Sequence, residues 1–277
     1  SLVYDLRLAC RPAREDPTGE RRTPMMSSDL VFYLAALPAA ALVGLSKGGL
    51  PVVGMLGVPV LALVVSPVQA AGLLLPIFVV SDWFGLWAYR REFSRRNLVI
   101  LVPGAVAGIA LGWATASLVS EAVVTLIIGA IGLAFALDRL AGRGAASEAR
   151  PADVPRGLFW GTVTGFTSFV SHSGGPPYQL YVLPQRLPKM VYAGTATIFF
   201  TIVNAVKLVP YWHLGQLSLA NLGKVAWLVP AAVAATFVGV RLTRLIPEVL
   251  FFRLVLGALA LVSAKLVFDG FRGLGVF

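Results

Sequence analysis

A glycine-rich tract at residues 44–51, which reads G-L-S-K-G-G-L-P, has the residue types of an anion site. Gly48 and Gly49 allow a tight backbone turn, and the following proline suits the first turn of a helix. Helix N-termini attract anions, and Lys47 and Ser46 would add an ammonium group and a hydroxyl donor. The tract predicts an anion held by Ser46, Lys47 and the Gly48–Gly49 backbone. Alternatively, Lys47 extends to the lipid headgroups and the glycines only turn a hairpin.

A second tract, T-S-F-V-S-H-S-G-G-P-P at residues 167–177, repeats this pattern with more hydroxyl donors and an imidazole. Histidine titrates near physiological pH, so His172 could bind an anion or relay a proton. The other predicted contacts with the substrate are the side chains of Ser171 and Ser173 and the backbone of Gly174 and Gly175. The alternative for His172 is a hydrogen-bonded packing residue.

Asp82 lies midway along an apolar stretch at 68–89. Burial of a carboxylate within a membrane costs free energy unless the carboxylate is paired or hydrated, so an acid at this depth indicates a functional site. We predict that Asp82 couples transport to protons, with His172 as a second candidate; the alternative is a structural hydrogen bond. Asn204 stands 122 residues later as a neutral counterpart and is expected to contact the substrate.

Two further polar residues are candidates for contact with the substrate. Lys207 stands about one helical turn after Asn204 but three residues before a proline, so extension to the membrane surface is an equal alternative. Gln179 could add hydrogen-bond donors beside the second tract, and hydrogen bonding in an apolar core explains it as well.

Several classes of chemistry are disfavoured by the sequence. It contains no H-E-x-x-H, Walker A or G-x-S-x-G motif, and its only histidines are His172 and His213. The single cysteine, Cys10, excludes an internal disulfide and a cysteine metal cluster. We therefore expect no enzyme activity, no metal and no cofactor.

The composition requires lipid around the elements that carry these residues. Hydrophobic residues make up 57% of the 277-residue chain and charged residues 13%, with a mean hydropathy of +0.81, whereas soluble domains carry roughly 25% charged residues. The net charge of +10 comes from short basic clusters between apolar segments, which is the positive-inside pattern of membrane proteins. Membrane lipid is therefore an expected partner, and nucleic acid is not.

Apolar stretches long enough to cross a bilayer predict six spanning helices, at 68–89, 98–117, 122–140, 189–209, 222–243 and 248–268. Shorter stretches occur as two pairs separated by the glycine-rich tracts, at 30–46 with 51–65 and at 157–170 with 176–186. Each pair is expected to enter from one side, turn near the midplane and leave on the same side, with short tilted crossings as the alternative.

An internal repeat relates the two halves. Gly44, Gly54, Pro67, Ile77 and Phe78 recur 121 residues later as Gly165, Gly175, Pro188, Ile198 and Phe199. The order of elements also recurs: a broken pair, a helix that begins at proline, and two further helices. The predicted fold is therefore an all-α polytopic membrane protein of two repeats, each a broken helix pair followed by three transmembrane helices.

The placement of arginines predicts that the repeats are inverted. Arg90, Arg91, Arg95 and Arg96 follow the first helix that begins at proline, whereas only His213 lies at the equivalent place in the second half. The next loop reverses this bias, with Arg241 and Arg244 in the second half alone. Inverted repeats around broken helices are typical of secondary transporters, with the binding site at the breaks.

The predicted organisation has four parts: residues 1–24, repeat 1 at 25–141, a cytoplasmic linker at 142–155 and repeat 2 at 156–277. Residues 1–24 lack an apolar segment and carry five arginines, although this arrangement places the chain start outside. We expect a disordered or non-native extension there, translated from upstream of Met25 or Met26; a genuine cytosolic arm is the alternative.

The motifs resemble the TauE/SafE sulfite-exporter family of membrane permeases from about Asp29 to Asp269. The tracts that carry the resemblance are G-L-S-K-G-G at 44–49, S-P-V-Q-A-A-G and L-L-P-I-F-V-V-S-D-W-F-G-L-W-A-Y-R-R within 66–91, G-F-T-S-F-V-S-H-S-G-G-P-P at 165–177, L-P-Q-R-L-P-K at 183–189 and I-F-F-T-I-V-N-A-V-K at 198–207. The resemblance implies transport of small sulfur-containing anions, such as sulfite or organosulfonates. Many members carry three glycines at the breaks, where this chain has K-G-G and S-G-G-P-P.

These observations favour a secondary transporter of small anions in a bacterial cytoplasmic membrane, coupled to protons through Asp82. Two alternatives stay open: an anion channel, and a membrane scaffold or assembly protein that transports nothing. The sequence allows a homodimer without indicating one.

Overall fold

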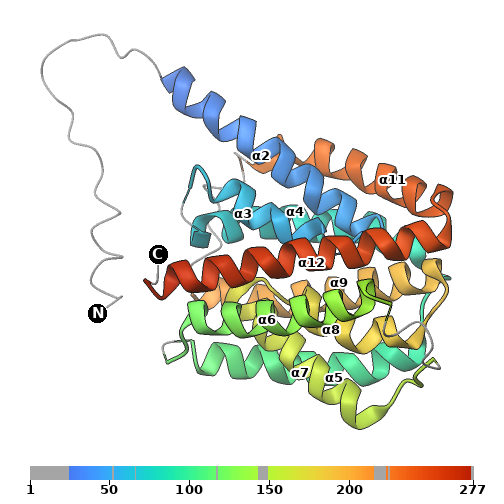
Figure 1. The fold of residues 1–277 in the computed structure, drawn as a ribbon. Helices are drawn as coiled ribbons and strands as arrows, with labels where there is room; N and C mark the ends of the chain where they lie inside the picture. The colour runs from blue at the N-terminus through green and yellow to red at the C-terminus, as the bar shows by residue number, and fades with distance from the viewer. Residues whose placement is uncertain are drawn as a thin grey trace, which may run out of the picture.

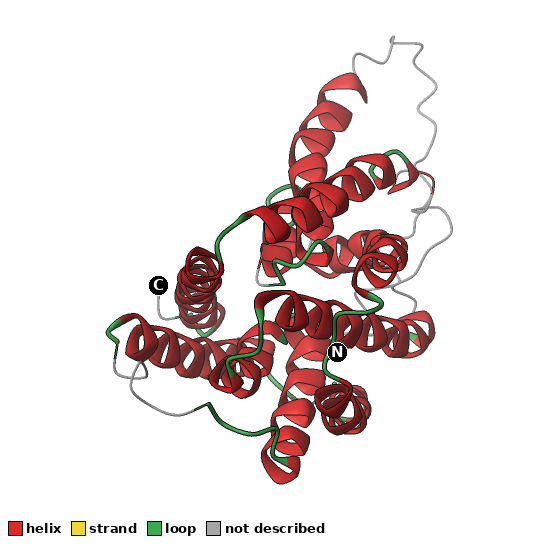
Figure 2. Ribbon diagram, turned by 90° about the vertical axis from the view of Figure 1, so that its right-hand side faces the viewer, coloured by secondary structure: helices red, strands yellow, loops and turns green. Residues whose placement is uncertain are grey.

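The structure is a computed structural model of the chain, in which the described residues form helices joined by loops and turns, with no strand among them (Figures 1 and 2). The described residues are 25–51, 53–65, 67–116, 118–142, 149–214, 223 and 225–275. The predicted extension at 1–24 and residues 143–148 of the predicted linker lie outside them. The predicted all-α fold is confirmed.

Six described helices are long and apolar enough to cross a membrane. They are α2 (Met25–Lys47), α4 (Pro67–Tyr89), α5 (Arg95–Ala114), α6 (Glu121–Leu140), α9 (Lys189–His213) and α12 (Glu248–Gly273). Five of them match predicted spans. The sixth, α2, was expected to be short, but its helix begins in the polar residues before the apolar run. The span predicted at 222–243 is instead the 17-residue helix α11 (Val229–Leu245), with Pro230 in its first turn.

Both predicted breaks are present, and at each the chain doubles back. After α2 come the 3₁₀ turn η1 (Val53–Leu56) and the short helix α3 (Gly57–Leu61). Gly54 lies against Ser46 and Gly57 against Val43, so this arm returns along α2. Gly49, with a φ of 112°, makes the turn in a conformation that glycine adopts readily. This geometry agrees with a re-entrant hairpin.

The second break has the same form. Helix α7 (Val154–Ser171) ends at His172 in the left-handed conformation, and α8 (Gly175–Val182) and η2 (Leu183–Gln185) follow. The hydroxyl of Tyr181 donates to the carbonyl oxygen of Asp153 (3.0 Å), which brings the end of α8 back to the start of α7.

Close helix contacts occur at corresponding places in the two halves. A Cβ at Gly44 of α2 would lie 2.0 Å from the carbonyl oxygen of Ala232 on α11. A Cβ at Gly165 of α7 would lie 2.0 Å from that of Ala105 on α5. Each helix pair can approach this closely only because glycine has no side chain.

Two further pairs of corresponding helices lie side by side and run antiparallel. In α4 and α9, Asp82 contacts Thr201, whereas Ser94, just beyond α4, contacts Thr195 nearer the start of α9. In α6 and α12, Gly132 meets Ser263 and Gly273 meets Ala122. Helices α4 and α9 therefore point in opposite directions, and so do α6 and α12.

Basic residues from distant parts of the chain gather at one end of the bundle. Arg90 and Arg91, at the end of α4, line one pocket with Arg241 and Arg244 of α11. Lys189 donates to the carbonyl oxygen of Arg244 (3.0 Å), which places the start of α9 at the same end. These basic residues therefore lie together, although they come from distant parts of the sequence.

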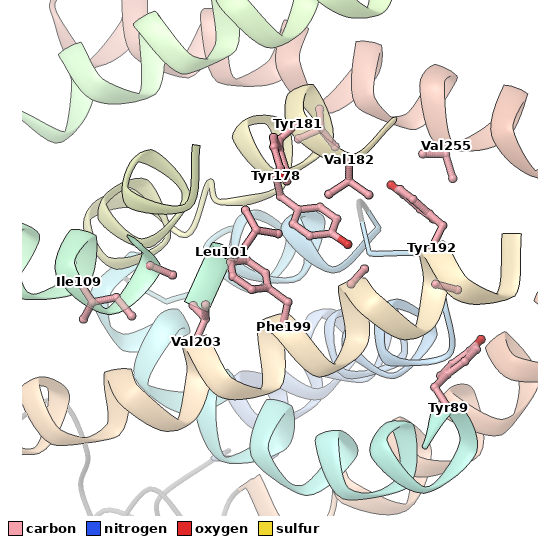
Figure 3. Packing of buried hydrophobic residues seen from close by; sticks show 14 of the residues in the cluster. Tyr89, Leu101, Ile109, Tyr178, Tyr181, Val182, Tyr192, Phe199, Val203 and Val255 are labelled. Atoms are coloured by element: carbon pink, nitrogen blue, oxygen red, sulfur yellow. The ribbon is translucent and has the colours of Figure 1, made fainter. Parts of the chain in front are cut away.

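An aromatic core fixes the short helix α8 (Figure 3). Tyr178 stacks on Phe199 of α9 with ring centroids 5.3 Å apart, and both side chains are fully buried. Tyr192, also on α9, packs edge-on against Phe251 of α12. This packing holds the second break against α9, the helix that carries Asn204 and Lys207.

Candidate functional site

The two breaks meet at a buried cavity of about 60 Å³ between α4 and α9. Since one water needs roughly 10–15 Å³ by this measure, the space suits a few waters or a small ion. Its walls combine polar and apolar side chains from both halves. They include Ser46, Lys47, Gly54, Met55 and Phe78 from the first half and Ser168, His172, Gly174, Gly175, Thr197, Phe200, Asn204 and Lys207 from the second.

Lys47 and Asp82 form an ion pair beside this cavity. The Nζ atom of Lys47 lies 2.7 Å from a carboxylate oxygen of Asp82, and each residue is 3% exposed. Thr201 donates to the same carboxylate (2.8 Å), and the amide of Asn204 donates to its other oxygen (3.2 Å). The predicted mid-membrane carboxylate is thus fully paired, and Lys47 does not extend to a lipid headgroup here.

The backbone around Lys47 is held from α9 and from its own helix. Thr197 donates to the carbonyl oxygen of Lys47 (3.3 Å), and Ser46 donates to that of Val43 (2.6 Å). A Cβ at Gly54 would lie 2.5 Å from the hydroxyl oxygen of Ser46, so a larger residue at 54 would displace this serine. These contacts position the ammonium of Lys47, which lies 5.2 Å from the ring centre of Phe78.

Lys207 supplies a second buried ammonium. It is 2% exposed, and its Nζ donates to the carbonyl and the hydroxyl oxygen of Ser168, both at 3.1 Å. Among the described residues it forms no ion pair with a carboxylate. The alternative that Lys207 extends to the membrane surface does not describe this structure.

Two tyrosines hold the breaks from equivalent positions, 122 residues apart. Tyr89 of α4 donates to the carbonyl oxygen of Gly48 (2.6 Å). Tyr211 of α9 donates to that of Phe169 (3.4 Å), which is the residue 121 positions after Gly48. The hydroxyl of Tyr211 also lies 2.8 Å from Nε2 of His172. Equivalent tyrosines of the two halves therefore make equivalent hydrogen bonds to the backbone of the two breaks.

Gly48 and Gly49 were expected to offer backbone donors to an anion, but here they complete the last turn of α2. Their N–H groups donate to the carbonyl oxygens of Gly44 (3.0 Å) and Ser46 (3.3 Å). Neither glycine lines the cavity. In the second break Gly174 and Gly175 do line it, and the two prolines that follow lack N–H groups, so the donors of this turn must come from the glycines.

Three other predicted contacts lie outside the cavity wall. The hydroxyls of Ser171 and Ser173 donate to the carbonyl oxygens of Thr167 (3.2 Å) and Ser171 (2.9 Å). Gln179 is fully buried, and its amide has no hydrogen-bond partner among the described residues. These side chains shape the break rather than face the space beside Lys47.

The sequence reasoning missed Ser168, Thr197 and Thr201. The repeat could have indicated Ser168, which stands 121 residues after Lys47. Thr201 and Thr197 lie about one and two turns before Asn204 on α9, so the helical period could have indicated them as neighbours on its face.

The arrangement suits anion binding. Two ammonium groups face one carboxylate, which leaves one positive charge in excess when all three are ionised, and buried hydroxyl and amide donors surround them. No cluster of metal-ligating side chains occurs within the described residues.

The comparisons with known proteins give the family. The family model described as sulfite exporter TauE/SafE matches residues 36–266, which is most of the chain. Neither the comparison with curated proteins nor the comparison with solved structures found a match. Together with the six apolar helices, the family match shows that the chain belongs to the sulfite exporter TauE/SafE family and is a multi-pass membrane transporter.

Proposed function

We propose that the protein is a secondary transporter of small sulfur-containing anions, sulfite or organosulfonates, in a bacterial cytoplasmic membrane. The observation that carries the proposal is the buried cavity where both breaks, two lysines and one carboxylate meet. The family supports a sulfur anion as the substrate, and the charge excess supports an anion on physical grounds alone.

In this proposal the anion lies between Lys207 and Lys47. Lys207 is the first electrostatic contact because no carboxylate among the described residues forms an ion pair with it. Asn204, His172 and the Gly174–Gly175 backbone supply hydrogen bonds to oxyanion oxygens. Ser46 joins them once its hydroxyl turns away from the carbonyl oxygen of Val43. The apolar part of the wall, which includes Met55, Phe78 and Phe200, would contact the carbon chain of an organosulfonate.

In the proposal, Asp82 couples proton binding to anion binding, because its carboxylate competes with the substrate anion for the ammonium of Lys47. While Asp82 is ionised, its carboxylate occupies the ammonium of Lys47 at 2.7 Å. Protonation of Asp82 removes the negative charge and frees Lys47 for the substrate. Proton and anion then bind together, and anion binding strengthens as the pH falls.

Alternating access follows from an inverted relation between the halves. The antiparallel packing of α4 on α9 and of α6 on α12 supports that relation. A sequence match between L-V-P-G-A-V-A at 101–107 and L-V-P-A-A-V-A at 228–234 supports the repeat itself. The hydrogen bond of Tyr89 to Gly48 closes one break, and that of Tyr211 to Phe169 closes the other. Breaking one of these bonds at a time would open the cavity to one side.

Flux into proteoliposomes tests the proposal. We expect uptake of labelled sulfite or an organosulfonate that responds to a proton gradient in the wild type. Lys207→Met should lose most of this uptake. Lys265→Met is a charge-matched control, since Lys265 pairs with Asp269 on α12 and does not line the cavity.

The outcome separates the rival functions. Flux that ignores the proton gradient would indicate a channel. Absence of flux for every anion tried, with correctly folded protein, would indicate a scaffold. Equal flux in Lys207→Met and Lys265→Met would place the substrate elsewhere.

A further inference from the structure

A second pocket opens between the ends of α4 and α11, apart from the cavity described above. It has a volume of about 590 Å³, and its wall carries four arginines, Arg90, Arg91, Arg241 and Arg244, together with one acid, Glu92. All four arginines are exposed, and none forms an ion pair with a carboxylate within the described part of the chain. The pocket is therefore strongly electropositive.

The remaining wall is apolar and aromatic. Trp87 is 61% exposed, and the guanidinium of Arg90 lies over its ring at 5.1 Å from the centroid. Phe237 of α11 contributes a second exposed ring. Tryptophan beside arginine is typical of the level of lipid headgroups, where an aromatic ring meets both water and hydrocarbon.

The surface that continues from this pocket along the two helices is also apolar. Trp83 of α4 and Val238 of α11 are exposed and stand one turn or less from the pocket residues Trp87 and Phe237. A ligand whose charged end lay among the arginines would place its other end on this surface. Inorganic anions have no such end, and small organosulfonates have only a short one, whereas phospholipids carry two long acyl chains.

We propose that this pocket binds the headgroup of an anionic phospholipid, with the phosphate among Arg90, Arg91, Arg241 and Arg244 and the acyl chains along α4 and α11. Arginine suits a phosphodiester because its planar group donates two parallel hydrogen bonds. Basic pockets between membrane helices at the cytoplasmic side are suited to such headgroups. A volume of this size falls in the range of roughly 300–1,000 Å³ that holds whole ligands rather than single ions.

The lipid would join two elements that belong to different halves of the chain. Arg90 and Arg91 follow α4, whereas Arg241 and Arg244 lie in the last two turns of α11. Tyr89 and Thr243, beside these arginines in sequence, both donate to the carbonyl oxygen of Gly48, at 2.6 and 3.1 Å. The bound lipid would thus hold together the two helices that fasten the first break.

The test compares lipid binding by three purified proteins: the wild type, Arg241→Ala/Arg244→Ala, and Arg95→Ala/Arg253→Ala. The last variant removes the same charge from exposed positions that do not line the pocket. Native mass spectrometry measures retained phosphatidylglycerol and cardiolipin, and thermal melting in phosphatidylcholine nanodiscs measures stabilisation when either lipid is added. All three proteins should fold, since each substituted side chain is exposed.

We expect the pocket variant to bind anionic lipid about tenfold or more weakly than the wild type and to lose the stabilisation, while the control keeps both. Equal retention by the three proteins would overturn the proposal. The same melting experiment is repeated with inorganic phosphate. If phosphate stabilises the wild type to the same extent as phosphatidylglycerol, the pocket holds a soluble anion and the lipid assignment is wrong.

Discussion

Removal of one partner of the Lys47–Asp82 pair should destabilise the protein more than removal of both. At 2.7 Å the attraction amounts to about 6 kcal/mol for an effective dielectric constant of ~20. Desolvation of the two ions offsets much of this attraction, so the intact pair contributes little net stability. A single substitution leaves one buried charge without its partner, which typically costs about 3–5 kcal/mol.

Lys47→Met, Asp82→Asn and the double variant form the required set, and thermal unfolding in detergent is the assay. Each single variant should melt roughly 6–20 °C below the wild type. The double variant should melt close to the wild type because it buries no unpaired charge. Added sulfite should restore the melting temperature of Asp82→Asn, whose free ammonium can bind it, but not that of Lys47→Met.

The melting temperatures of the three variants distinguish a coupled ion pair from two independent residues. Single variants that melt with the wild type would show that the ion pair does not form. A double variant that loses the sum of the two single effects would show that Lys47 and Asp82 act independently. The coupling free energy from the cycle separates these results from the predicted one.

Three further predictions concern coupling, packing and the breaks. In Asp82→Asn, the affinity for an organosulfonate, which stays ionised over this pH range, should lose most of its dependence on pH, whereas wild-type affinity should rise as the pH falls; parallel pH profiles by calorimetry would contradict the coupling role. Gly165→Ala should lower stability by about 1–3 kcal/mol in thermal unfolding, because its Cβ would meet a carbonyl oxygen at 2.0 Å, while Gly257→Ala, with open space around it, should not. Tyr89→Phe removes one hydrogen bond from the first break, so amide hydrogen exchange at residues 48–50 should become faster, and unchanged exchange would show that the hydroxyl does not hold the break.

The sequence predicted the helical membrane fold and both breaks because these depend on local signals. Apolar length determines a spanning helix, and a glycine pair followed by proline determines where it stops. The prediction of helix ends was less accurate, because the residues that flank each apolar run decide where the helix begins. Helix α2 is longer and α11 shorter than their apolar runs, since Pro230 and the polar residues before Leu30 place the helix starts.

The candidate site was predicted in its residue types but not in its pairing. Lys47, His172, Asn204 and Lys207 do line one cavity, and Asp82 lies beside it. The sequence did not indicate that Asp82 would neutralise Lys47, because 35 residues and a helix crossing separate them. Nor did it indicate that the N–H groups of Gly48 and Gly49 donate to carbonyl oxygens of α2. The glycine pair was interpreted as the free N-terminus of the next helix, whereas it completes the C-terminal end of α2.

The most direct test of the proposed anion site is a thermal-shift screen of the wild type and Lys207→Met against sulfite, sulfate, small organosulfonates and small carboxylates. At least one of the sulfur anions should stabilise the wild type in a saturable way. Lys207→Met should lose that stabilisation while Lys265→Met keeps it. Equal stabilisation of all three proteins, or of none, would contradict an anion site between the two breaks.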